Sequence, residues 1–346
     1  MARGRTDTRR QIEFRRGPLR ETSTTTSPEH ADHRLDILYK RLLFRALGTT
    51  PILSRSYTLH PAQSVRYRGF AAMASSPASF QLPRDVLNQS MYTQLREIWF
   101  RGHTQTPVPD ASLLKRWFSI GSLEERDAFD RECSSIASIP LTAIAPSELV
   151  LPPFQSYADD VKNAEIIASP FLNEVKEARQ TDAETGAGTF LSLVLLLDQM
   201  PRNTLRRQDE LPLVFNHYDR IARALVRSVL ATDPNIMDQT TMGSRVYWTW
   251  LLLPFMHSED LPTHELALKL ERHWRQRDRE PTEGPIAEFA ARWITNEDEH
   301  IEPIKRFGRY PHRNQCLGRA STPEEMEYLT TTKNYGVKQE PAKDEL

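Results

Sequence analysis

Three stretches of the sequence place acidic, basic and histidine residues directly after an apolar helical pattern. They are Asp198-Gln199-Met200-Pro201-Arg202-Asn203, then His257-Ser258-Glu259-Asp260, then the segment from Arg306 to Asn314. Histidine beside a carboxylate can transfer protons near neutral pH, and the planar guanidinium of arginine pairs with carboxylate or phosphate oxygens. The sequence therefore predicts one polar site, made by Asp198, Arg202, Asn203, His257, Glu259, Arg306, Arg309, His312, Arg313 and Asn314.

An anionic ligand is the function that the arginines favour. Arg202, Arg309 and Arg313 could hold a small carboxylate or phosphate, because each guanidinium can make paired hydrogen bonds to such oxygens. The terminus of a peptide offers the same chemistry. We therefore predict a groove for a small anionic molecule or a peptide end.

The histidines offer a catalytic alternative. His257 or His312 could act as a general acid or base, oriented by Asp198 or Glu259. The chain contains no HExxH pattern, no Gly-rich phosphate loop and no nucleophile-elbow sequence around Ser258, so no reaction class is indicated.

A metal site would have to draw on His257, Glu259, His300 and His312, which contain a set of two histidines and one carboxylate. These residues come from separate segments, and their spacing is not typical of metal ligands. We expect neither a metal nor another cofactor.

Two further alternatives involve no chemistry. The same polar residues could form buried ion pairs and hydrogen bonds that hold helix ends together. A helical protein of this kind could also serve as a scaffold for protein partners, for which an exposed apolar groove would be the sign, whereas the three stretches are strongly polar.

Apolar residues at near-helical spacing, separated by Pro- or Gly-bearing joints, run from Leu82 to Tyr328 and predict an all-α fold. The short joints favour antiparallel helical hairpins. A last short helix should begin at Thr322, with Glu325 completing a capping box. The other helices are expected at residues 85–100, 113–118, 128–136, 157–179, 189–199, 213–230, 244–256, 261–276 and 285–306.

Prolines mark two special places in this pattern. Four of them between residues 139 and 154 predict an irregular loop. Pro201 disfavours helix at Met200, so Asp198 is expected in the last turn of its helix, where an acid needs a cationic or hydrogen-bonding partner. If the three helices belong to successive hairpins, their polar ends should cluster in one concave region, with Asp198, Arg202, His257, Glu259, Arg309 and His312 together.

The three stretches also carry a family resemblance. LLLDQMPRN, LPFMHSEDL and HIEPIKRFGRYPHRN followed by LGRASTPEE are similar, in this order, to signature stretches of the domain of unknown function 924 family. The similarity covers residues 86–329 and is weak before residue 189. The resemblance implies a right-handed superhelix of antiparallel hairpins, of tetratricopeptide-like type, and brings no settled activity or cofactor.

Composition excludes several classes of protein. The formal net charge is -1, and the arginines of the body occur within ordered motifs, so we expect no nucleic-acid partner. No apolar run reaches the length of a membrane-spanning helix. The two cysteines provide no disulfide framework, and nothing in the sequence indicates an oligomeric state.

The first part of the chain differs from the rest. Residues 1–73 contain fourteen Lys or Arg against six Asp or Glu, and residues 37–81 contain no acid. We predict a disordered basic leader at 1–81, a helical domain at 82–332 and a disordered tail at 333–346. The leader is typical of a mitochondrial transit peptide. Alternatives are a cytoplasmic form starting at Met73, or retention in the endoplasmic reticulum through the terminal Lys343-Asp344-Glu345-Leu346.

Overall fold

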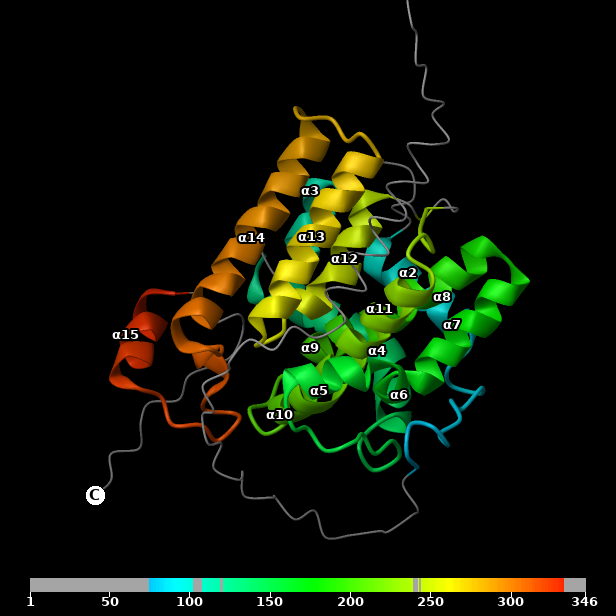
Figure 1. Ribbon diagram of the computed structural model, residues 1–346, viewed down its shortest axis with the longest axis horizontal. Coiled ribbons are helices and arrows are strands. Elements are labelled where there is room, and N and C mark those ends of the chain that lie inside the picture. The colour runs from blue at the N-terminus through cyan, green and yellow to red at the C-terminus, as the bar shows by residue number, and fades with distance from the viewer. Residues whose placement is uncertain (1–74, 102–107, 119–120, 239–241, 243, 333–346) are drawn as a thin grey trace, which may run out of the picture. The chain divides into compact units, whose positions relative to one another are not determined.

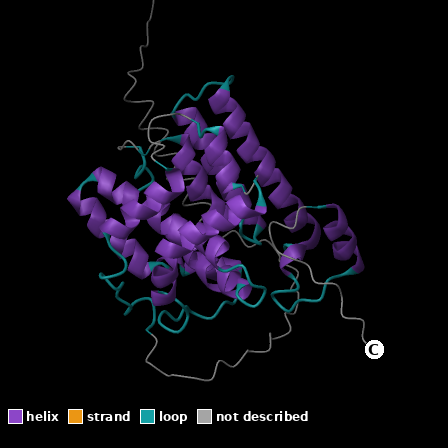
Figure 2. Ribbon diagram, turned by 180° about the vertical axis from the view of Figure 1, so that it is seen from behind, coloured by secondary structure: helices purple, strands orange, loops and turns teal. Residues whose placement is uncertain are grey.

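The computed structural model describes residues 75–101, 108–118, 121–238, 242 and 244–332. The predicted tail and most of the predicted leader lie outside the described residues, so the transit peptide, the start at Met73 and the retention signal stay predictions. The all-α fold is confirmed for the described part of the chain (Figure 2). Its β-type pairing is limited to one isolated parallel bridge between Ser75 and Leu149.

The first three described helices begin where the sequence supplies an N-cap. Asn88 accepts a hydrogen bond from the Met91 backbone, Asp110 caps the next helix, and Ser122 forms a capping box with Glu125. Such caps satisfy backbone N–H groups that have no partner within the helix. The helices are α2 (Gln89–Phe100), α3 (Ala111–Trp117) and α4 (Leu123–Ala143).

Helix α4 overturns part of the predicted loop at 139–154. Pro140 lies inside α4 and is buried, and the helix continues to Ala143. A proline removes one helical hydrogen bond, but the end of α4 gains others from outside. Tyr218 donates its hydroxyl to the Leu141 carbonyl at 2.9 Å, and His217 Nε2 bonds the Ile144 carbonyl at 2.8 Å.

The single helix predicted at 157–179 is wrong, because the chain breaks twice there. The amide of Asn163 donates to the Asp159 carbonyl at 2.9 Å, which competes with a regular helix. The second break precedes Pro170, which lies in the first turn of α7 and has no N–H to continue the preceding helix. The observed helices are α5 (Tyr157–Lys162), α6 (Ala164–Ile167) and α7 (Ser169–Thr181).

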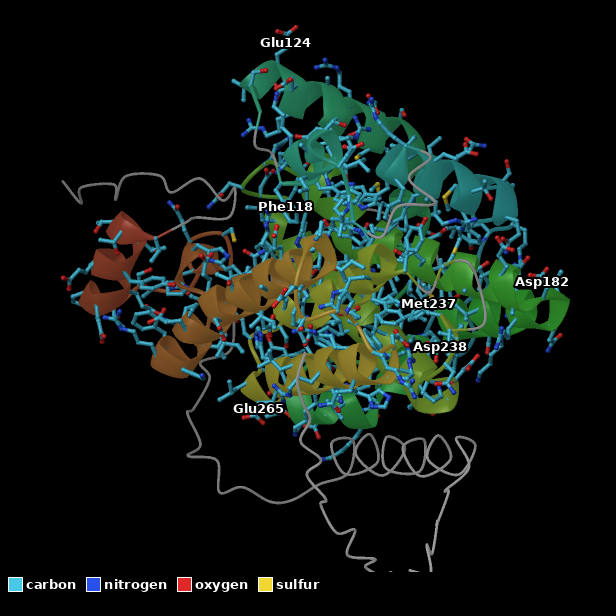
Figure 3. The ribbon with its side chains drawn as sticks, turned by 90° about the horizontal axis from the view of Figure 1, so that it is seen from above. Phe118, Glu124, Asp182, Met237, Asp238 and Glu265 are labelled. Carbon is cyan, nitrogen blue, oxygen red and sulfur yellow. The ribbon has the colours of Figure 1, made fainter. Side chains whose placement is uncertain are left out.

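Helix α8 (Ala183–Val194) begins before the predicted residue 189 and packs along α7 after the single joint residue Asp182. Gly186 and Gly188 lower helix propensity, so the sequence pattern did not predict this start. Close contacts of α8 with Arg179 and Arg96 nevertheless require small residues at both positions. An added Cβ would lie 2.9 Å from Arg179 Cα and 3.1 Å from the Arg96 guanidinium, respectively. Asp182, the joint between α7 and α8, lies at the edge of the described structure (Figure 3). Glu124, in the first turn of α4, lies at another edge.

The chain does not end its helix at Asp198, which corrects the prediction made from Pro201. A π-helical turn, η1 (Leu195–Gln199), leads directly into α9 (Met200–Thr204), where Pro201 occupies the first turn and needs no hydrogen bond. A second π-helical turn recurs in the next helical stretch. That stretch consists of α10 (Leu211–Leu213), η2 (Val214–Tyr218) and α11 (Asp219–Thr232).

The remaining helices confirm the sequence pattern closely. Helices α12, α13 and α14 lie side by side (Figure 1), and the capping box of Thr322 and Glu325 begins α15 as predicted. The bounds are α12 (Arg245–Met256), α13 (Leu261–Arg277), α14 (Pro285–Phe307), the 3₁₀ turn η3 (Pro311–Arg313) and α15 (Pro323–Thr331).

Helices α8 and α12 supply the centre of the core. All residues of α12 are buried, and Trp250 meets Trp99 and Trp117 edge-on at centroid distances of 4.8 and 4.9 Å. Aromatic pairs of this geometry add to the stabilisation from apolar burial. The polar ends of α8 and α12 are therefore held by well-packed helices.

Replacing Leu191, which is fully buried in α8, with alanine should lower the free energy of unfolding by roughly 2–5 kcal/mol. The cause is lost apolar burial together with the cavity left behind. Chemical denaturation measures it, with Leu123→Ala as the control because Leu123 is 63% exposed. Equal effects of the two substitutions would contradict the described packing of α8.

Candidate functional site

Asp198 is the most enclosed charged group of the three stretches. It lies in η1 with a fully buried side chain. Its carboxylate accepts hydrogen bonds from His257 Nδ1 at 2.8 Å and Gln199 Nε2 at 2.5 Å, and lies 3.4 Å from Arg202 Nη1. Burial alone would raise the pKa of Asp198, but His257 and Arg202 outweigh it and hold the pKa below its ordinary value. Asp198 is therefore ionised at neutral pH.

Arg202 connects Asp198 with a second buried carboxylate. Its guanidinium bonds both oxygens of Asp219, at 2.7 and 2.9 Å, and donates to the Asp198 carbonyl at 2.6 Å. Asn203 donates to the Gln199 carbonyl at 2.9 Å. The donors that the sequence assigned to a ligand are thus bonded to the protein itself. Sequence analysis missed Asp219, because no local pattern in the sequence indicates that it pairs with Arg202.

His257 follows α12 and has a side chain that is 15% exposed. An ionised carboxylate only accepts hydrogen bonds, so we assign the imidazole proton to Nδ1, which leaves Nε2 with a lone pair. Burial and the charge of Arg202 lower the pKa of His257, against the opposite effect of Asp198. His257 is therefore a neutral imidazole with its basic nitrogen directed away from Asp198.

Two more neutral imidazoles adjoin His257 around the ring of Tyr310. The centroid distances are 6.3 Å from His257 to His300, 6.0 Å from His300 to Tyr310 and 5.3 Å from Tyr310 to His312. Burial lowers the pKa of His300 to about 3 and that of His312 well below its ordinary value. The second and third stretches therefore meet at one cluster of uncharged histidines.

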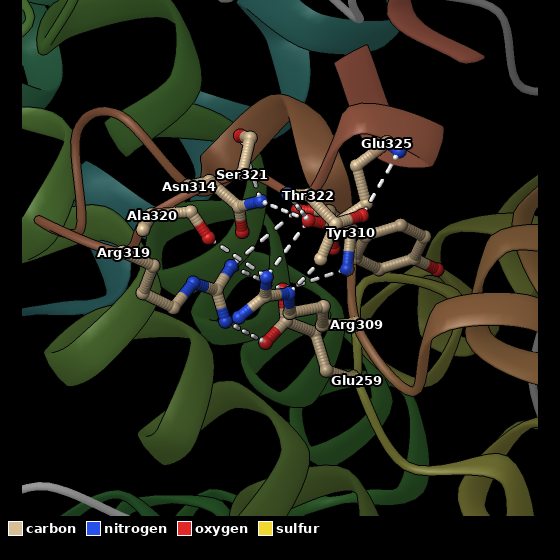
Figure 4. A network of polar contacts seen from close by, with 9 residues as sticks. All are labelled: Glu259, Arg309, Tyr310, Asn314, Arg319, Ala320, Ser321, Thr322 and Glu325. Atoms are coloured by element: carbon tan, nitrogen blue, oxygen red, sulfur yellow. Dashed lines mark hydrogen bonds and ion pairs between the residues drawn. The ribbon is translucent and has the colours of Figure 1, made fainter. Parts of the chain in front are cut away.

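Glu259 joins the second stretch to the third. It accepts a hydrogen bond from the Tyr310 backbone at 3.0 Å and a pair from Arg319 at 2.7 and 2.9 Å (Figure 4). Burial acts to raise its pKa, but the bonds from Arg319 and the charge of Arg313 lower it. Arg319 lies in the LGRASTPEE stretch, yet its partner is 60 positions away, and sequence reasoning missed it.

The other predicted residues of the third stretch bond to α15. Arg309 makes a pair of hydrogen bonds to Glu325 at 2.6 and 2.8 Å, and Asn314 donates to the same carboxylate at 3.2 Å (Figure 4). Arg306 pairs with Glu324 on the surface at 2.7 Å. These contacts attach the last helix to the site.

Arg313 differs from the other predicted arginines. Its side chain is 6% exposed and its guanidinium lies between the rings of Phe215 and Tyr310, at 4.3 and 4.5 Å from their centroids. Within the described part of the chain it has no hydrogen bond or ion pair to a carboxylate. Of the arginines predicted to hold an anion, it is the one without a hydrogen bond to a carboxylate among the described residues, although its charge acts on Glu259.

Sequence analysis also missed a buried pair next to Tyr310, formed by His264 and Glu297. His264 places Nδ1 2.7 Å from Glu297 and Nε2 2.8 Å from the Ser258 carbonyl, and both side chains are fully buried. Tyr310 Oη donates to the Met256 carbonyl at 2.6 Å beside them. His264 lies on α13 and Glu297 on α14. The apolar pattern of each helix does not indicate that the two residues pair.

The structure thus links the predicted residues from Asp198 through His257 and Tyr310 to Glu259. Arg306, Arg309 and Asn314 form a second group, which contacts Glu324 and Glu325 of α15. Among the described residues, no set of three or more His, Cys, Asp or Glu is arranged to hold a metal ion. None of the described helices is long and apolar enough to cross a membrane.

Glu325→Gln should lower the free energy of unfolding at neutral pH by roughly 1.5–3 kcal/mol, because Arg309 and the Thr322 backbone lose a charged partner. Burial acts to raise the pKa of Glu325, but these bonds lower it from 4.5 to about 2. The carboxylate therefore contributes stability above about pH 4.5 and loses it as the pH falls to about 2.

The difference between wild type and variant should accordingly shrink over that pH range in urea denaturation. Glu324→Gln is the control, because its ion pair with Arg306 is exposed and contributes roughly 0–1 kcal/mol. A difference that stays constant down to pH 2 would contradict the described Glu325 contacts.

Comparison with known proteins places these residues in a family. The pattern of the family described as "Bacterial protein of unknown function (DUF924)" matches residues 95–333, more than half of the chain. A solved structure, "Protein of Unknown Function ATU0120 from Agrobacterium tumefaciens", is 22% identical, covers 69% of this chain and 97% of its own, and has a TM-score of 0.43. No curated protein matches. The chain belongs to the DUF924 family.

Proposed function

We propose that the protein is an enzyme acting on a small polar molecule, with His257 as its general base. The observation that carries this proposal is the 2.8 Å hydrogen bond from His257 Nδ1 to the buried carboxylate of Asp198. It fixes the ring and reserves Nε2 for proton transfer. The side chain of His257 is 15% exposed, so the ring is not sealed from solvent.

The surroundings of Asp198 suit this role. In the reaction step, Nε2 takes a proton from water or from an acidic group of the substrate, and Asp198 stabilises the imidazolium that forms. Arg202 and Gln199 hold Asp198 in its ionised form and fixed in position. Nε2 then returns the proton to the product, so His257 ends the cycle neutral.

An anionic substrate has support from Arg313. Its guanidinium has no carboxylate bonded to it among the described residues, and its charge acts on His300 and His312. Arg202 and Arg309 are less suited to a ligand, because each would have to give up a paired carboxylate. The predicted small anion or peptide end would therefore bind through Arg313, with its reacting group near His257.

A tetratricopeptide-like superhelix serving as a scaffold is the second proposal. The hairpin of α7 and α8 and the neighbouring α12, α13 and α14 support it. A scaffold does not require a fixed tautomer at His257, so the state of that ring distinguishes the two functions.

We expect His257 in the full chain to be neutral at pH 7, with its proton on Nδ1. Nitrogen-15 NMR of histidine-labelled protein reports this directly. The variant Asp198→Asn no longer offers His257 a carboxylate that only accepts hydrogen bonds. The imidazole proton should therefore move partly from Nδ1 to Nε2. A wild-type His257 that is protonated on Nε2 at pH 7 would rule out its role as base.

Catalysis is tested with a panel of small carboxylic and phosphate esters. Turnover that belongs to this site should fall by about 10²-fold or more in His257→Gln and remain in His273→Gln, the control on α13. Because the pKa of His257 is lowered, the rate should fall only on the acid side of pH 6.5. Asp198 raises the pKa of His257, so removing Asp198 should lower that pKa and move the acid limb of the pH–rate profile to lower pH. Turnover that survives His257→Gln would contradict the proposal.

A further inference from the structure

Helix α11 carries a row of three arginines that sequence analysis did not single out. Arg220, Arg223 and Arg227 are separated by three and four residues, so they project from one face of the helix. Their exposed fractions are only 8%, 9% and 6%. Arginine is almost never this buried unless it is paired.

Among the residues that the structure describes, only the first of the three has a carboxylate partner. Arg220 bonds both oxygens of Asp160, at 2.9 and 2.7 Å, and the Pro152 carbonyl at 3.0 Å. Arg227 makes one long contact, at 3.4 Å, to the hydroxyl of Thr263. Arg223 has no hydrogen bond or ion pair with any residue in the described part of the chain.

The guanidiniums of Arg223 and Arg227 each lie over an aromatic ring, which does not neutralise their charge. Arg223 lies 5.3 Å from the ring centroid of Tyr157, and Arg227 lies 5.6 Å from that of Phe255. Burial lowers the pKa of Arg227 to about 10, with a further lowering by the charge of Arg223 that Asp260 opposes. The unliganded protein thus carries two adjacent, poorly compensated cations, which is unfavourable.

The row faces one small cavity of about 20 Å³, lined also by Tyr157, Asp160 and Thr263. This volume holds about one water molecule, so an entering anion must displace the flexible arginine side chains outward. The lining contains three positive groups and one negative group, which leaves an excess of two positive charges.

We propose that this arginine row is a binding site for the phosphate group of a small phosphate monoester. At neutral pH such a group carries about -1.5 to -2 charges, which matches the excess of positive charge, whereas one carboxylate supplies half of it. The paired N–H groups of arginine suit phosphate oxygens, and the hydroxyl of Thr263 adds a polar contact at the same wall. The site does not depend on His257 or on its proposed reaction.

A purely structural role for the row makes the opposite prediction about the unliganded protein. If Arg223 and Arg227 serve only to pack on aromatic rings, methionine in their place loses a cation–π contact and destabilises the fold. If they are held ready for an anion, removing an uncompensated buried charge leaves the unliganded protein as stable as before or more stable. Binding and stability should then change in opposite directions.

The experiment uses the full chain and compares wild type with Arg223→Met, Arg227→Met and Arg207→Met. The last variant removes the same charge at a side chain that is 73% exposed, so it controls for overall electrostatics. Inorganic phosphate and acetate are the probes. Calorimetric titration gives binding, and thermal melts with and without each ion give stability.

We expect phosphate to raise the melting temperature of wild type and of Arg207→Met, with acetate having little effect. Arg223→Met and Arg227→Met should bind phosphate about tenfold more weakly or worse, while their melting temperatures without phosphate equal or exceed that of wild type. Arg223→Lys, which keeps the charge but loses the paired donors, should bind with intermediate affinity.

Four results would overturn the inference. The first is no phosphate response in wild type, and the second is an equal response to acetate. The third is a phosphate response that persists in both methionine variants. The fourth is lower stability of these variants without phosphate, which would assign the row to packing instead.

Discussion

The buried negative charge of Asp198 is the constraint on which the rest of the polar structure depends. A carboxylate removed from water is unfavourable unless cations and hydrogen-bond donors surround it. Here the donors come from η1 itself, from α9 through Arg202 and from the end of α12 through His257. Arg202 in turn fixes Asp219 at the start of α11. One charge therefore determines how four segments meet.

Much of the site could be predicted from local sequence, but its pairing could not. The polar stretches after α8, α12 and α14 are continuous in sequence, and the structure joins them through His257 and Tyr310. The partners Asp219, Arg319 and Glu325 are single charged residues far away along the chain. Whether such a residue faces solvent or an opposite charge depends on tertiary register, which no local pattern encodes.

The same limit applies to the helices. The capped starts of α12 and α15 were predicted. Those of α4 and α8 were not, although Ser122 and Asp182 cap them, because the apolar pattern begins several residues later. The continuation past Pro140 depends on a contact from elsewhere in the fold. The first break between α5 and α7 instead accompanies a local contact, from the Asn163 side chain to the Asp159 carbonyl. The arginines of α11 show the difference most clearly. A charged row on an amphipathic helix usually marks the solvent face, yet this row is buried and faces α5 and Thr263.

The two π-helical turns make the site sensitive to chain length. Each turn, 195–199 and 214–218, accommodates one residue more than an α-helix would. An α-helix advances about 100° per residue. Loss of one residue from the first turn would therefore rotate α9 by that angle and carry Arg202 off Asp219. A relative that keeps this ion pair should therefore keep the length of the first turn as well.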